Sequence, residues 1–188
     1  MQNEIGNYMV KALFIAVALI LIILVAQFNS VAKPLIITVQ IVFSFIGVLL
    51  GFIIFGIDIS IMMTGMGVIA VAGIVVKNAI ILIDYIDMAM ENAEDKVDAI
   101  VRAGATRLTP VMLTALSTIL GLMPLALGIN INFLTLFTEL DPQIYFGGDS
   151  VAFWNPLAWT IVFGLAFATF LTLIVVPAMY RIFYVKEK

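Results

Sequence analysis

The chain has 188 residues, of which 64% are hydrophobic and only 11% are charged, whereas a soluble domain usually has about 25% charged residues. The formal net charge is −3 and the sequence contains no block of basic residues, which excludes a nucleic-acid partner. Cysteine and histidine are absent, so disulfides, thiolate nucleophiles and Cys/His metal sites are excluded as well. We expect a protein of the lipid bilayer that carries no cofactor.

Five apolar segments are each long enough to cross the hydrocarbon core as a helix of about 20 residues. None of them alternates apolar and polar residues, as the strands of a membrane barrel would. The expected fold is therefore all-α and integral to the membrane, with five transmembrane helices. The predicted spans are 8–28, 35–55, 61–83, 109–128 and 157–180.

The basic residues predict how these spans are oriented, because cytoplasmic loops carry an excess of lysine and arginine. If the spans alternate in direction, one side of the membrane holds Lys33, Lys96, Arg102, Arg107, Arg181, Lys186 and Lys188. The other side holds only Lys11, and the segment 129–155 has no basic residue. We therefore expect residues 1–7 and the loop 129–155 to be periplasmic and the tail 181–188 to be cytoplasmic.

Two connections and two helix faces are expected to have structure of their own. In the cytoplasmic segment 90–107, apolar residues share one helical face and Asp98 and Arg102 form an i,i+4 pair. This pattern fits a short amphipathic helix at the membrane surface or an ordinary solvated helical linker. The loop 129–155 is rich in aromatic residues, which suit the membrane interface. Gly47 and Gly51 in the second span, and a four-residue repeat of small residues in the fifth, predict helix-packing faces.

Lys77 is the residue that most suggests a function, because apolar sequence surrounds it within the third span. An ammonium group at such depth costs roughly 2.5–3.5 kcal/mol. One interpretation is a lysine that snorkels to the interface, although Asp84, about 10 Å along the helix, is too far away to pair with it. Ala70 and Gly73 share the helical face of Lys77, and small residues let another helix approach. This favours a lysine that points into a helix bundle, opposite a counter-ion.

The fourth span has a matching polar face, formed by Thr114, Ser117, Thr118 and Gly121. Because the third and fourth spans run antiparallel, Lys77 and Thr114 are expected at similar depth. For Ser117 and Thr118, hydrogen bonding of the hydroxyl to its own helix is the favoured interpretation. For Thr114, that interpretation and a functional role both remain open.

No predicted span has an aspartate or glutamate near its middle, since Asp58 and Asp84 lie at span ends. A counter-ion for Lys77 is therefore expected from outside this sequence. Five spans also place the two termini on opposite sides of the membrane, and no leader precedes the outward N-terminus. Both observations predict that a further segment upstream of this sequence is missing.

Four stretches of the sequence together resemble one transporter superfamily. They are LVAQFNS at Leu24–Ser30, GIVVKNAIILID at Gly73–Asp84, RLTPVMLT at Arg107–Thr114 and GLMPL at Gly121–Leu125. In this order and spacing they resemble the resistance–nodulation–division superfamily, and within it the hydrophobe/amphiphile multidrug efflux pumps of Gram-negative inner membranes. The resemblance covers essentially the whole chain and corresponds to the eighth to twelfth spans of such a pump.

This resemblance implies a homotrimeric, proton-driven exporter in the bacterial inner membrane, working with a periplasmic adaptor and an outer-membrane channel. A lysine that pairs with two aspartates of another span falls on Lys77. A threonine and an arginine of the same proton-coupling network fall on Thr114 and Arg107. Asn78 matches the motif and is expected to pack or to form hydrogen bonds. The loop 129–155 is longer than in the best-known drug pumps, so the resemblance does not carry the substrate class.

Other classes of function fit the sequence less well than a transporter. A membrane-embedded enzyme would need paired in-span aspartates or Cys/His ligands, which the sequence lacks, and a self-contained small transporter would need an acidic site of its own. The alternative that stays open is a non-transporting membrane subunit, or a truncated remnant, that packs against an aspartate-bearing partner.

Overall fold

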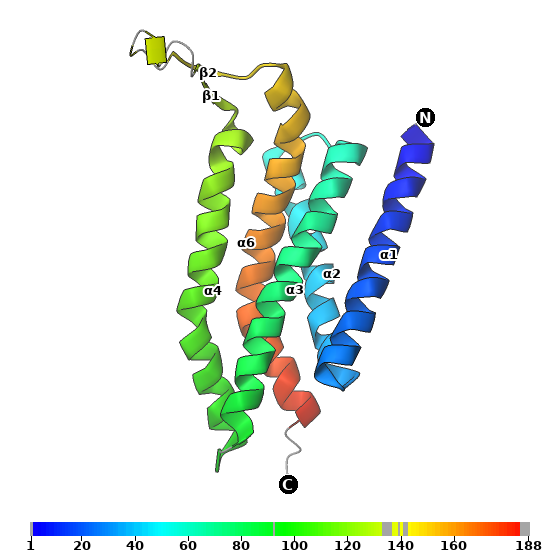
Figure 1. Cartoon of the computed structure of the whole chain (residues 1–188), viewed down its shortest axis with the longest axis vertical. Coiled ribbons are helices and arrows are strands. Elements are labelled where there is room, and N and C mark those ends of the chain that lie inside the picture. The colour runs from blue at the N-terminus through cyan, green and yellow to red at the C-terminus, as the bar shows by residue number, and fades with distance from the viewer. Residues whose placement is uncertain (1, 92, 133–136, 139, 141–142, 185–188) are drawn as a thin grey trace.

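The computed structural model describes residues 2–91, 93–132, 137–138, 140 and 143–184. It contains five long helices and a small β-hairpin, arranged as an elongated bundle with the hairpin at one end (Figure 1). The elements are α1 (Gln2–Phe28), α2 (Ala32–Phe55), α3 (Ile61–Glu91), α4 (Lys96–Leu127), β1 (Ile129–Ile131), β2 (Ile144–Phe146) and α6 (Asp149–Tyr184). All five helices are long and apolar enough to cross a membrane, which confirms the predicted all-α membrane fold.

The helices are longer than the predicted spans, and this changes the interpretation of segment 90–107. That segment is not a helix of its own, because α3 continues to Glu91 and α4 already begins at Lys96. Asp95 caps α4 by accepting hydrogen bonds from the backbone amides of Val97 and Asp98, at 2.8 and 3.3 Å. Helix α4 then runs without interruption through Gly104 and Pro110, so the amphipathic turns join the apolar span that was predicted to start at residue 109. The predicted pair of Asp98 and Arg102 forms, at 2.7 Å.

Parts of the chain ends and of the loop 129–155 have regular secondary structure. Residues 2–7 belong to α1, and residues 181–184 belong to α6. In the loop, β1 and β2 pair antiparallel, with Ile129 opposite Phe146 and Ile131 opposite Ile144. The remainder of the loop from Asp149 onward is the first part of α6, so this helix extends beyond the predicted span 157–180 at both ends.

Helix α6 occupies the centre of the packing, in contact with α2, α3 and α4, whereas α1 lies at the edge of the bundle and contacts α2 and α3 (Figure 1). Gly47 and Gly51 let α2 approach α6 closely, since a Cβ atom at either position would overlap the side chain of Phe167 or Phe163. This confirms the packing role predicted for the Gly47–Gly51 pair. Many large apolar side chains remain exposed along the helices, as expected for a surface that faces lipid or other membrane helices.

Candidate functional site

The residues predicted to carry chemistry gather on one open side of α3 and α4. A cavity of about 390 Å³ lies there, and Leu165 of α6 contributes to its lining. The lining includes Lys77 and Asn78 from α3 and Arg107, Thr114 and Thr118 from α4. Lys77 and Thr114 therefore do lie at similar depth, as the antiparallel arrangement predicts, although they are 37 positions apart in the sequence.

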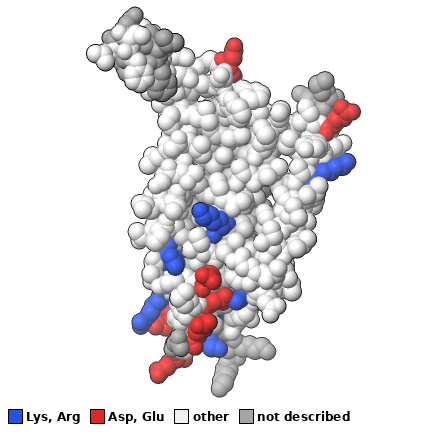
Figure 2. Space-filling model, viewed as in Figure 1, with Lys and Arg blue, Asp and Glu red and all other residues white. Residues whose placement is uncertain are grey.

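Lys77 lies near the middle of α3, and its side chain is exposed on the outside of this bundle. Within the part of the chain that the structure describes, no carboxylate forms an ion pair with it. Figure 2 shows basic side chains on an otherwise uncharged stretch of the surface, apart from the charged groups that gather at its lower end. The position does not fit a lysine held at the end of a span.

The small residues beside Lys77 form an open surface rather than an internal packing face. Ala70 and Gly73 on α3 are exposed, as are Ser117 and Gly121 on α4. A Cβ atom added at Gly73 or at Gly121 would meet no other atom within 4 Å, in contrast to the crowded glycines of α2. No helix among the described residues covers this surface, and its smooth relief suits the close approach of another helix.

Two threonine hydroxyls beside the cavity bond to the backbone of their own helix. Thr114 Oγ1 donates to the carbonyl oxygen of Val111 at 2.9 Å, and Thr118 Oγ1 donates to the carbonyl oxygen of Thr114 at 2.9 Å. This confirms the structural interpretation for Thr118. A hydroxyl oxygen that donates its proton still has lone pairs, so Thr114 at the cavity can accept a hydrogen bond from an ammonium group.

Arg107 links the two helices that form the cavity. Its guanidinium carbon lies 4.2 Å from the ring centroid of Tyr85 on α3, a distance typical of a cation–π interaction. Its Nε atom is buried, with no hydrogen-bond partner among the described residues. Asn78 is buried beside Lys77, which fits the packing role expected for it.

The cavity thus has two cationic groups, Lys77 and Arg107, and no aspartate or glutamate in its described lining. A basic group within a membrane bundle is costly unless an anionic partner compensates it. The arrangement is therefore suited to receive one or more carboxylates from a helix that covers this face.

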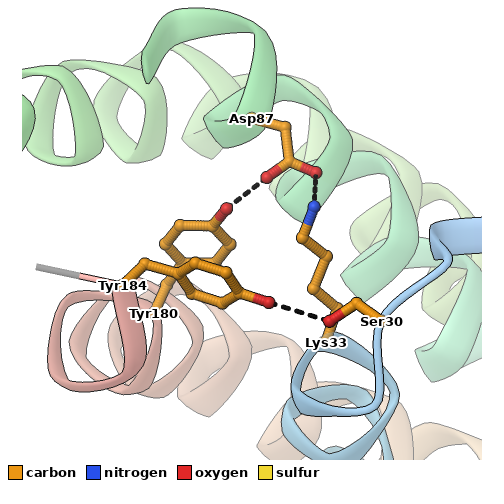
Figure 3. Close-up of polar contacts among 5 residues, drawn as sticks. All are labelled: Ser30, Lys33, Asp87, Tyr180 and Tyr184. Atoms are coloured by element: carbon orange, nitrogen blue, oxygen red, sulfur yellow. Dashed lines mark hydrogen bonds and ion pairs between the residues drawn. The ribbon is translucent and has the colours of Figure 1, made fainter. Parts of the chain in front are cut away.

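A second polar cluster, which the sequence analysis missed, joins three helices (Figure 3), at the end of the bundle away from the hairpin (Figure 1). Lys33 Nζ lies 2.6 Å from Asp87 Oδ2, and the hydroxyl of Tyr180 donates to the other oxygen of this carboxylate. Tyr184 stacks on Tyr180 and shares a hydrogen bond of 3.0 Å with Ser30. The residues come from the start of α2, the end of α3 and the end of α6, so no local spacing could have predicted the contact.

Comparison with known proteins supplies the context for this geometry. A sequence model of the AcrB/AcrD/AcrF family matches residues 1–132. The swarming motility protein SwrC of Bacillus subtilis is 34% identical over 171 residues, which are 91% of this chain and 14% of SwrC. The cobalt-zinc-cadmium resistance protein CzcA of Cupriavidus metallidurans is 32% identical over 93% of this chain and 15% of its own length. The multidrug resistance protein MdtC of Klebsiella pneumoniae is 31% identical over 94% and 16%, respectively.

The fold is also similar to that of a solved structure. The crystal structure of a heavy metal efflux pump superposes with a TM-score of 0.70 at 29% identity, covering 90% of this chain and 15% of the pump. The chain therefore spans only 14–16% of the length of these relatives.

Proposed function

Because this chain belongs to the AcrB/AcrD/AcrF family of the resistance–nodulation–division superfamily, we propose that it forms the eighth to twelfth spans of a proton-driven efflux transporter. Membership of this family makes the chain part of a transporter and not an enzyme. Lys77, Thr114 and Arg107 belong to the proton-coupling network, and Asn78 supports Lys77. The observation that carries this proposal is the cavity whose described lining has two cations and no carboxylate, on a face that the described helices leave open.

The coupling step is an electrostatic switch. When carboxylates on the covering helix are ionised, they hold the ammonium group of Lys77, with an attraction of about 4 kcal/mol for unit charges 4 Å apart at an effective dielectric constant near 20. Protonation of a carboxylate removes most of this attraction, and Lys77 then turns toward the lone pairs of Thr114. An energy difference of this size is enough to invert a two-state equilibrium between helix arrangements.

The same proposal extends to the assembly and its location. The transporter is a homotrimer of the bacterial inner membrane and works with a periplasmic adaptor and an outer-membrane channel. Its N-terminal half carries the in-membrane aspartates and covers the face of Ala70, Gly73 and Lys77. The open space at Gly73 and Gly121 supports this face as the place where the N-terminal half packs.

The exported compounds are proposed to be hydrophobic or amphiphilic. The similarity to MdtC, a multidrug resistance protein, supports this class, while CzcA and the solved pump are named for metal resistance or metal efflux. Growth of cells that express the intact transporter, challenged in parallel with amphiphilic drugs and with zinc, cobalt and cadmium salts, tests the choice. Protection against the metals alone would contradict it.

Replacement of the lysine tests the mechanism. In the intact transporter, reconstituted in liposomes with a pH gradient, Lys77→Ala should abolish substrate-dependent proton movement measured with an internal pH dye. Lys11→Ala is the matched control, because Lys11 is exposed on α1 and outside the cavity. Unchanged proton movement in Lys77→Ala would refute the coupling role.

A further inference from the structure

The base of the β-hairpin is hydrogen-bonded to the ends of two membrane helices. The amide of Gly147 donates to the carbonyl of Gly128, the C-cap of α4, at 3.0 Å. Asn130 Nδ2 donates to the carbonyl of Gly147 at 2.7 Å, and Asn155 Nδ2 of α6 donates to the carbonyl of Ala126 of α4 at 2.5 Å. These bonds hold the base of the hairpin at the ends of α4 and α6. Its position relative to the membrane is therefore set by the helices and not by a loose loop.

The hairpin exposes apolar side chains on both of its faces. Ile144, Tyr145 and Phe146, successive residues of β2, are 58%, 54% and 72% exposed. Side chains of successive strand residues point to opposite faces, so neither face is the polar, water-facing side of an ordinary hairpin. An isolated two-stranded hairpin is marginal in water, and this one has a surface that water does not favour.

The apolar surface of the hairpin continues that of the membrane helices. Leu113, Leu116, Leu120 and Leu127 are exposed and follow one face of α4 up to the cap at Gly128. Figure 1 shows β1 and β2 leaving this end of the bundle on the side of α4 and pointing away from the other helices. Phe153 and Trp154, which form an edge-to-face pair at the start of α6, are also half-exposed here. Aromatic residues at this level are typical of the membrane–water boundary.

We propose that the hairpin formed by β1 and β2 lies in the boundary between the headgroups and acyl chains of the adjacent lipid leaflet, as a membrane-anchoring element. The partner is a zwitterionic lipid surface. The described residues of the segment 129–146 include no charged side chain, so a lipid surface without net charge suits it and anionic headgroups would find no basic partner there. This surface is separate from the cation-lined cavity and does not depend on proton coupling.

Tryptophan fluorescence in liposomes tests the placement. The background variant is Trp154→Phe/Trp159→Phe in the full chain, reconstituted in phosphatidylcholine, with Phe146→Trp added as a single probe. We expect loss of its fluorescence with lipids brominated near the headgroup, less loss with lipids brominated near the chain end, and little loss with aqueous iodide. Adding phosphatidylglycerol should not increase the quenching by bromolipids, because the described part of the hairpin has no basic side chain.

Two control positions give the quenching expected inside the membrane and in water, and a second hairpin probe repeats the measurement on the other face of β2. Leu120→Trp, on the exposed face in the interior of α4, should be quenched most by lipids brominated near the chain end. Glu94→Trp, in the connection between α3 and α4, should be quenched by iodide. Tyr145→Trp, on the other face of β2, should repeat the result of Phe146→Trp, with helix content checked by circular dichroism. Quenching of both hairpin probes by iodide alone, or by neither quencher because protein covers them, would overturn the proposal.

Discussion

At the residue scale, burial separates two ion pairs that the sequence alone would treat as equal. The side chains of Lys33 and Asp87 are only 16% and 25% exposed, whereas those of Arg102 and Asp98 are 79% and 51% exposed. The carboxylate of Asp87 also accepts a hydrogen bond from Tyr180. Exposed pairs contribute little because solvent screens them, while removal of one partner from a partly buried pair leaves a desolvated charge.

We therefore predict that Lys33→Met lowers the free energy of unfolding by about 1–3 kcal/mol, since Asp87 loses a charged hydrogen bond. The measurement is unfolding of the chain in mixed micelles with increasing dodecyl sulfate, followed by circular dichroism. Arg102→Met is the matched control and should change the free energy by no more than about 0.5 kcal/mol. Equal losses of unfolding free energy in the two variants would show that the cluster at Asp87 stabilises the chain no more than the exposed pair does.

At the element scale, the glycines divide into two groups with opposite functions. Gly47 and Gly51 lie inside the packed contact between α2 and α6. Gly73 and Gly121 instead face open space beside the cavity. The first group holds this chain together. The second group is free to meet a further helix, and this difference supports the placement of the proposed partner.

Alanine substitutions should separate the two groups. Gly51→Ala is expected to destabilise the chain by about 1–3 kcal/mol, because the added methyl group overlaps Phe163 in a packed interface. Gly73→Ala should leave the isolated chain unchanged or stabilise it by up to about 1 kcal/mol through higher helix propensity. The unfolding assay in micelles measures both, and a destabilised Gly73→Ala variant would contradict an open face at this position.

At the scale of the whole molecule, the two ends of the bundle differ in chemistry. Most charged groups among the described residues lie between residues 84 and 107 or at Lys33 and Arg181. Charged groups gather at the lower end in Figure 2. The end with the hairpin is aromatic and has no basic residue between 129 and 155. This asymmetry is the basis for proposing a cytoplasmic lower end and a periplasmic hairpin.

Single cysteines can test this orientation without interference, since the natural chain has none. We expect Ser150→Cys, exposed at the start of α6, to react with a membrane-impermeant maleimide in intact spheroplasts. Glu94→Cys, exposed between α3 and α4, should react only after lysis. The opposite pattern would require an inverted membrane topology and would place the proposed proton pathway the other way round.

Much of the fold and part of the site could be predicted from local patterns. Hydrophobic length determined the five spans, and helical spacing in antiparallel spans placed Lys77 and Thr114 at similar depth. Helix ends were harder, because Lys96–Arg107 is polar enough to suggest a surface segment and yet continues the membrane helix. Apolar runs mark where lipid begins, but capping by Asp95 decides where the helix begins.

The sequence by itself determined that this chain spans a membrane, that Lys77 lacks an acidic partner within its spans, and that the chain resembles an efflux transporter. Those conclusions follow from composition and from residues close together along the chain. Only the tertiary structure decided that Lys77 and Arg107 share one open cavity, and that Asp87 joins Lys33 to Tyr180. The physical reason is that these contacts cross between helices, where rotation and separation of the axes, rather than local periodicity, bring the side chains together.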